Sequence, residues 1–303
     1  MQGIRELRSR IKSISGTAKI IKAMEMVSSS RIRKAQVRIL EARPFMNKIE
    51  AFISELSVFP GAFLNPLTKS NDDYESVIIL GITSDRGLCG SYNSNMIRHI
   101  EKRIEYYESL GKKVQLWITG IKGKNYFRYI GRNIEKSYDH LSDYPKFFDA
   151  REICNDFIDE YLEKRTGRVE LNFTKYNGLF EQKPVTRQVI PLPLEKMRER
   201  LYIELGITEQ INSFSKEEFL FEPSSNEVML SLVPEYINTL MYTALLESTA
   251  SEIAARMTAM KSASDSAEKM KKLLNNKYHR ARQQQITIEI SEIASGADAL
   301  INL

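Results

Sequence analysis

The sequence is poor in the residues that form covalent or metal cross-links. Its 303 residues include two cysteines, Cys89 and Cys154, and three histidines, His99, His140 and His279. Two cysteines are too few for a disulfide framework, so we expect a reducing compartment. The histidines are scattered and lack the spacing of metal ligands. These shortages exclude a small disulfide-stapled protein, and we predict no metal and no cofactor.

Long hydrophobic runs are also missing. No stretch approaches the ~18 uncharged apolar residues of a transmembrane helix, and the amino terminus has no apolar signal region. A hydrophobic share of 42% and a charged share of 27% are ordinary for a soluble chain of one or two domains. We therefore expect a soluble protein that is made without export.

Apolar residues at the start of the chain recur alternately every three and four residues. This seam comprises Ile4, Leu7, Ile11, Ile14, Ala18, Ile21, Ile32, Ala35, Ile39, Ala42, Met46, Ile49, Ile53 and Leu56. A 3.5-residue period is typical of a coiled coil. The pattern predicts a helix that ends near Val58 and is roughly 80 Å long at ~1.5 Å per residue. Pro44 should kink it, because proline removes a backbone donor, and Gly16 is a second soft point.

Two polar residues, Glu25 and Ser28, interrupt this seam without shifting its phase. Coiled coils often use a polar layer to set their register. Alternatively, the small residues at this level allow another subunit to approach closely. Both interpretations remain open on the sequence.

The other end of the chain predicts a second long helix. Neither proline nor glycine occurs between Glu235 and Ser295, a run of about 60 residues or roughly 90 Å of helix. Apolar or small residues recur there with near-heptad spacing, at Met257, Met260, Ala267, Met270, Leu274, Tyr278, Ala281 and Ile288. Two long helices at opposite ends of one chain pair most simply as an antiparallel coiled coil.

The middle of the chain alternates buried strands with helices. Strands are predicted at 76–83, 113–119, 133–136, 168–176 and 183–191, and helices at 93–110, 121–130 and 145–164. This order indicates a small, largely parallel Rossmann-like sheet covered by helices, with the last two strands as a hairpin at its edge. The predicted fold class is α/β, with the segments 1–58 (coiled-coil helix), 74–222 (globular domain) and 226–303 (coiled-coil helix).

Positive charge is concentrated at the amino terminus. Residues 1–43 hold eleven Lys and Arg and three Glu, a net charge of +8 in a chain whose total is +5. A basic helix can bind nucleic acid, an anionic lipid surface or an acidic protein sleeve, or can simply be the solvated face of a coiled coil. A basic coiled-coil nucleic-acid-binding protein is therefore an alternative prediction.

The segment Thr83–Gly90 (TSDRGLCG) follows a predicted parallel strand, where open α/β sheets bind ligands. It lacks the glycine and lysine spacing of nucleotide-binding loops. Cys89 has no nearby histidine to activate it, since His99 lies two to three turns further along a helix. We expect a structural turn, in which Asp85 and Arg86 form local hydrogen bonds, rather than an enzyme with a cysteine nucleophile.

Several of these segments together resemble the gamma subunit of F-type (rotary) ATP synthases. The amino-terminal signature appears as Lys19–Val27 (KIIKAMEMV) and Arg31–Gln36 (RIRKAQ), and the sheet motif as Thr83–Gly90 followed by Tyr92-Asn93. The carboxy-terminal signature appears as Glu247–Met260 (ESTASEIAARMTAM), Tyr278–Gln283 (YHRARQ) and Ile286–Ile293 (ITIEISEI). The matches occur in family order and span both predicted long helices and the lobe.

The resemblance implies a non-catalytic rotor subunit in the central stalk. Its partners would be three alpha and three beta subunits, an epsilon subunit and the membrane ring of c subunits. Ion flow would turn the ring, and the asymmetric stalk would drive each beta site through its states. The chain would sit peripherally on the cytoplasmic face of the membrane, associated only through the complex. The coupling ion, H⁺ or Na⁺, and the ring size are determined by other chains.

The resemblance also assigns roles by motif position. Arg282, Gln283 and Thr287 align with positions that hydrogen-bond a beta-subunit loop, and Met24 aligns with a position beside a beta lever segment. Phe219 and Glu222 align with a stretch that touches the c-ring loops. The apolar end of the chain would turn within the sleeve formed by the collar. Residues 301–303 extend beyond the usual family ending, and their role is open.

Overall fold

The computed structural model describes residues 3–57, 65–69, 74–197, 199, 222 and 224–301. The chain divides into two compact units, Met1–Ser29 with Arg256–Leu303, and Ser30–Ala255. We call the first the distal unit and the second the lobe unit. The predicted division into segments 1–58, 74–222 and 226–303 stays a prediction.

Two long helices each contribute to both units. Helix α1 covers Ile4–Leu56 and continues through Pro44, and α6 covers Ser225–Ile301 and continues through Pro234. The predicted α1 seam is confirmed residue by residue, because none of its apolar members is exposed. The α6 pattern is wrong at two positions: Met270 and Ile288 are 49% and 57% exposed. Ile288 lies beyond Ala281, the last half-buried residue of α6.

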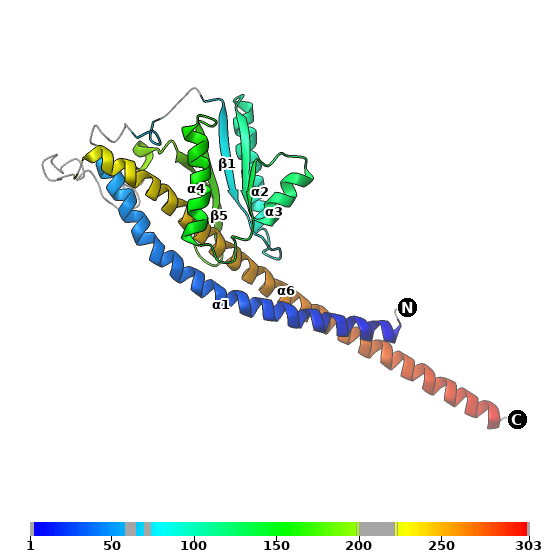
Figure 1. Cartoon of the computed structure of the whole chain (residues 1–303). Coiled ribbons are helices and arrows are strands. Elements are labelled where there is room, and N and C mark those ends of the chain that lie inside the picture. The colour runs from blue at the N-terminus through cyan, green and yellow to red at the C-terminus, as the bar shows by residue number, and fades with distance from the viewer. Residues whose placement is uncertain are drawn as a thin grey trace. The chain divides into compact units, whose positions relative to one another are not determined.

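The lobe unit contains a five-stranded sheet with the order β3-β2-β1-β4-β5 (Figure 1). Its strands are β1 (Ser76–Ile82), β2 (Lys113–Thr119), β3 (Lys136–Tyr138), β4 (Arg168–Tyr176) and β5 (Gln182–Ile190). The helices α2 (Tyr92–Ser109), α3 (Ile121–Tyr129) and α4 (Phe147–Leu162) connect the parallel strands. Only β5 pairs antiparallel, with β4. The α/β fold class is confirmed.

One detail of the sheet differs from the prediction. Strand β3 begins at Lys136, whereas the sequence pattern placed it at 133–136. The predicted edge hairpin is confirmed: β4 and β5 pair antiparallel at one edge of the sheet, with β5 outermost and β4 joined in parallel to β1. The burial of the two strands follows this order, since β4 is buried along most of its length whereas β5 is mostly half-buried.

Hydrophobic side chains cover both faces of the sheet. On one face, Val77 and Ile79 of β1 pack against α2 and α3, with Phe127 of α3 fully buried. On the other face, Ile78 and Leu80 pack against α4 and the lobe-unit parts of α1 and α6. This face anchors the two long helices, because α1 contributes Met46, Ile49, Ile53 and Leu56 to the core and α6 contributes residues from Met229 to Leu245.

Candidate functional site

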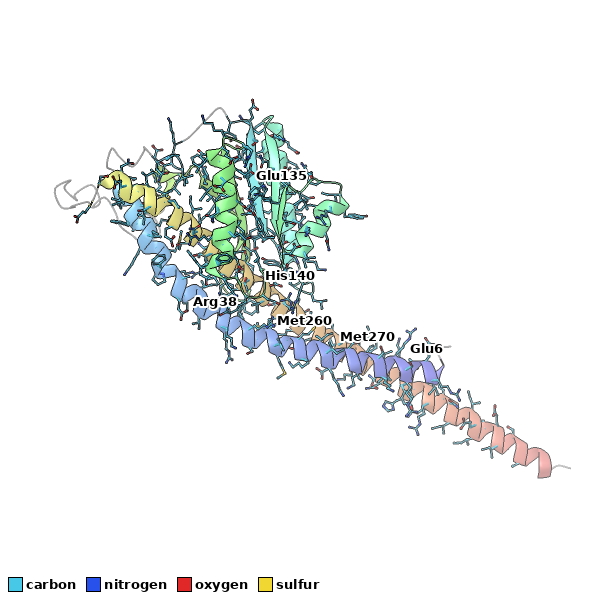
Figure 2. The ribbon with its side chains drawn as sticks, in the orientation of Figure 1. Glu6, Arg38, Glu135, His140, Met260 and Met270 are labelled. Carbon is cyan, nitrogen blue, oxygen red and sulfur yellow. The ribbon has the colours of Figure 1, made fainter. Side chains whose placement is uncertain are left out.

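The distal unit is an antiparallel pair of helices. Its segments of α1 and α6 run in opposite directions side by side (Figure 1). The most buried apolar side chains of this pair are Leu7 on α1 and Met260 and Leu274 on α6. Figure 2 shows Glu6 on the α1 segment and Met260 and Met270 on the α6 segment. The seam gives this part of the chain the interhelical packing of a coiled coil.

The polar interruption of the seam is satisfied within α1 itself. The Ser28 hydroxyl is buried and donates to the Met24 carbonyl oxygen at 2.8 Å. Glu25 is half-buried and forms an ion pair with Lys22 at 3.0 Å. A hydroxyl bonded to its own helix needs no other partner. Met24 is half-buried, so part of its thioether surface remains open.

The carboxy-terminal part of α6 has no covering helix. Every side chain described from Arg282 to Ala297 is exposed, and α6 continues past the amino-terminal end of α1 (Figure 1). Ile286, Ile288, Ile290 and Ile293 are 43%, 57%, 61% and 72% exposed. We call Arg282–Ala297 the bare end. Exposed isoleucines in such number on one short stretch of helix are typical of a surface that a partner covers.

Three predicted site residues lie together on the bare end. Arg282, Gln283 and Thr287 are exposed, and the Thr287 hydroxyl donates to the Gln283 carbonyl oxygen at 3.0 Å. Residues 283 and 287 are one helical turn apart and therefore share a face. The Arg282 and Gln283 side chains are available to a partner.

The structure does not bring Met24 to this cluster. Met24 is twenty residues from Ile4, the first residue of α1, or about 30 Å along the helix. The bare end begins only where α1 stops covering α6. Glu222 is exposed, and Phe219 lies outside the described residues. Within the distal unit, Met24 and the cluster of Arg282, Gln283 and Thr287 thus lie in separate places.

Unpaired positive charge marks the distal unit. Its residues 1–29 and 256–303 hold fourteen Lys and Arg against seven Asp and Glu, a net charge of +7. On the α1 segment, Arg10 pairs with Glu6 and Lys22 pairs with Glu25. Arg5, Arg8, Lys12 and Lys19 are exposed and form no ion pair with any described residue. The unit therefore presents a basic surface.

A scan against protein-family models matches residues 3–300 to the model described as ATP synthase. The ATP synthase gamma chain of Chlorobium phaeobacteroides is 36% identical, over 99% of this chain and 99% of that protein. The gamma chain of Heliobacterium modesticaldum is 37% identical, over 99% of this chain and 100% of that protein.

The chain belongs to the ATP synthase gamma chain family.

Two solved structures with a similar fold come from mitochondrial ATP synthases. A chain of the Euglena gracilis mitochondrial ATP synthase superposes with a TM-score of 0.65 at 17% identity, covering 98% of this chain and 94% of that one. A chain of the Tetrahymena thermophila mitochondrial ATP synthase central stalk and c-ring gives a TM-score of 0.61 at 23% identity, covering 81% and 99%. At these identities the likeness shows the fold, including the pair of long helices.

The Thr83–Gly90 motif of this gamma-chain family member is a structural turn. Gly90 has a φ of +57°, which favours glycine, and Cys89 is buried, with its sulfur accepting from Asn93 at 3.2 Å. The prediction of local hydrogen bonds is confirmed for Arg86, whose carbonyl oxygen accepts from the Ser84 hydroxyl at 2.6 Å, and is wrong for Asp85. Asp85 bonds residues from two other loops, and Arg86 pairs with Asp143 at 2.8 Å. The ends of parallel strands bring these loops together, which sequence spacing could not indicate.

Contacts that sequence analysis missed join α1 to the rest of the lobe unit. The Gln36 side chain donates to the Tyr176 hydroxyl at 2.7 Å, and Arg43 donates to the Tyr176 carbonyl oxygen and pairs with Glu247 at 3.4 Å. Burial raises the pKa of the Glu247 carboxyl, and nearby cations including Arg43 lower it in part. The sequence offered only an indirect sign of these contacts, because Gln36 and Arg43 lie in the basic run and Glu247 lies in the carboxy-terminal signature.

None of the helices in the described part of this gamma-chain family member combines the length and hydrophobicity that a bilayer span needs. Within the same residues, no three His, Cys, Asp or Glu side chains gather into a metal site.

Proposed function

We propose that this chain is the shaft of the central stalk in an F-type ATP synthase. It would couple ion flow through a c-ring to conformational changes at three beta-subunit sites, where ATP is made. The chain itself would carry no catalytic residue and bind no cofactor. One asymmetric shaft inside a threefold collar presents a different face to each site, so it can bias three two-state elements differently at once.

The observation that carries this proposal is the bare end of α6 on a basic two-helix unit. Four isoleucines exposed over about two turns of one helix lack any partner among the described residues, as expected of the tip of a shaft that other subunits enclose. The net charge of +7 on the distal unit suits an acidic inner surface of a collar of alpha and beta subunits. Family membership supports the same assembly.

The coupling contacts belong to the proposal at residue level. Arg282, Gln283 and Thr287 would hydrogen-bond a beta-subunit loop, and their exposure on one stretch of helix supports this role. Met24 would contact a beta lever segment, and its half-buried thioether can adapt to a moving surface. Phe219 and Glu222 would touch the c-ring loops, next to an epsilon subunit. The complex would hold the chain peripherally at the cytoplasmic face of the membrane.

The basic distal unit also favours the alternative of nucleic-acid binding. Such binding would be driven by counterion release and would fall steeply with salt, without any partner subunit. A rotor needs its partners and shows no such affinity at physiological salt. A filter-binding titration of the purified chain at two salt concentrations separates the two functions.

Co-purification tests the proposal directly. The tagged chain is expected to bring down an ATP-hydrolysing assembly with three alpha and three beta subunits for each copy of the chain. The stoichiometry is read by quantitative mass spectrometry of the eluted complex. Recovery of the chain alone from gently solubilised membranes would contradict the rotor function.

The Arg282→Ala substitution tests the coupling cluster. We expect ATP synthesis in membrane vesicles to fall about tenfold, because a hydrogen bond to a charged group contributes roughly 1.5–3 kcal/mol. The complex should still assemble, since Arg282 is exposed and has no described partner within the chain. Arg280→Ala, two residues earlier and also exposed, is the matched control. Full synthesis in the Arg282→Ala complex would remove this assignment.

A further inference from the structure

We propose that the loop between β3 and α4, residues 139–146, clasps α1 through Arg38 and carries torque between the lobe and this helix. We call these residues the clasp. The inference rests on the proposed rotor function and adds to it a positioning role for Arg38. All of its contacts lie within the lobe unit, between residues 31 and 242.

The base of the clasp is tied to the ends of β1 and β2. The Asp85 carboxylate, just after β1, accepts hydrogen bonds from the backbone N–H groups of Ile121, His140 and Ser142 at 3.0–3.2 Å, and from the Ser142 hydroxyl at 2.8 Å. Burial raises the pKa of Asp85, but these four hydrogen bonds outweigh it and the pKa is lowered. The carboxylate therefore stays ionised, which keeps its hydrogen bonds strong.

The next residue of the clasp bridges α1 to the same motif. One carboxylate oxygen of Asp143 pairs with Arg31 on α1 at 3.2 Å, and the other pairs with Arg86 at 2.8 Å. All three side chains are 41–65% exposed, so this bridge alone contributes little energy. Its effect is to align the clasp along α1.

Arg38 is the centre of the attachment. Its guanidinium lies 4.0 Å from the centre of the Tyr144 ring and donates to the Pro145 carbonyl oxygen. The same nitrogen donates to the Tyr242 hydroxyl of α6 at 3.1 Å. One side chain of α1 thus contacts both the clasp and the second long helix. Figure 2 shows Arg38 on α1 and His140 in the clasp.

The chemistry of these contacts suits a load that turns one element against another. From Met46 to Leu56, α1 is attached by apolar packing, which is non-directional and allows neighbouring surfaces to repack. Around residues 31–38 the apolar seam continues through Ile32 and Ala35, and the clasp adds polar, directional contacts to it. A planar guanidinium that stacks on one ring and donates in its own plane has a defined orientation, which an ammonium group cannot reproduce. The clasp therefore sets the rotation of α1 about its own axis.

Torsional stiffness in the assembled complex tests this role. A bead is attached through Tyr129→Cys, a site that is 89% exposed on the lobe, while both native cysteines are buried. The collar is fixed to a surface, and the angular variance of the bead is recorded in pauses of ATP-driven rotation. Because variance is inversely proportional to stiffness, Arg38→Ala should raise it roughly 1.5-fold through loss of the charge-assisted contacts. Arg38→Lys should raise it nearly as much.

Matched variants separate torque transmission from folding. Arg33→Ala removes an exposed cation of α1 that has no ion pair in the described ranges, and the variance should not change. The combination of Tyr144→Ala and Tyr242→Phe removes two Arg38 contacts while keeping Arg38, and should raise the variance if Arg38→Ala fails to assemble. Unchanged variance in an assembled Arg38→Ala complex, or in the combined variant, would overturn the clasp. Absence of rotation in the unsubstituted complex would instead overturn the rotor function, and the clasp with it.

Discussion

Deletion of residues 284–303 is expected to lower ATP synthesis at least tenfold while the lobe keeps its stability. The deletion removes most of the bare end, including all four exposed isoleucines. Burying one such side chain against a partner contributes about 1.5–3 kcal/mol, so loss of the set should weaken the hold of the collar on the shaft. Synthesis and ATP-driven proton pumping are measured in membrane vesicles.

The stability of the lobe can be followed separately. Trp117 is the single tryptophan of the chain and is fully buried in β2, so its fluorescence reports the unfolding of the lobe unit. The deleted residues described by the structure are exposed, and their removal should leave this transition in place. A second variant replaces Ile286, Ile288, Ile290 and Ile293 by glutamine and keeps the helix length. Proton pumping at the normal rate in both variants would contradict the role of the bare end.

Glu170→Ala is expected to destabilise the lobe by about 3 kcal/mol, at the low end for breaking a buried ion pair. Glu170 on β4 is 2% exposed and accepts from Nε and Nη2 of Arg103, at 3.0 and 2.9 Å. It also accepts from Arg168 at 3.3 Å and from the Tyr107 hydroxyl. Without the carboxylate, two guanidinium groups remain close together with no anion between them. Urea unfolding monitored by Trp117 fluorescence measures the change.

The control for this prediction is Glu105→Ala on α2. Glu105 is exposed and has no hydrogen bond or ion pair with a described residue, so its removal should change stability by less than about 0.5 kcal/mol. Glu170→Gln keeps the shape of the side chain and part of its hydrogen bonding. Its loss of stability should therefore lie between the losses of Glu105→Ala and Glu170→Ala. Equal unfolding midpoints for Glu105→Ala and Glu170→Ala would show that the network does not support the lobe.

The long helices and most strands could be predicted because their signals are local. The α1 seam repeats every seven residues, so the buried positions of this helix follow from spacing within the helix itself. Strand β3 was misplaced because three residues carry too little periodicity. The pairing of β4 with β1 was not predicted, because β1 lies about ninety residues earlier in the chain. Pairing at that distance follows from how the helices cover the sheet, which no window of sequence contains.

The candidate site likewise has residues that the sequence could locate and contacts that only the structure revealed. The sequence, with its resemblance to a known family, located Arg282, Gln283 and Thr287, and the structure added that they lie exposed on a bare helix end. The clasp was invisible, because Arg38 and Tyr242 are separated by 204 positions. A basic residue in a basic run gives no sign of which ring or carbonyl it will meet.

By itself the amino-acid sequence determined that two helices would form, which face of α1 would be apolar, and that the middle of the chain would be an α/β domain. These properties follow from spacing along the chain, and spacing acts within a few turns or one strand. The tertiary structure alone decided that β4 lies inside the sheet, that the bare end is uncovered, and that Arg38 meets Tyr144 and Tyr242. Each of these depends on contacts between distant segments, which form only when the whole core packs.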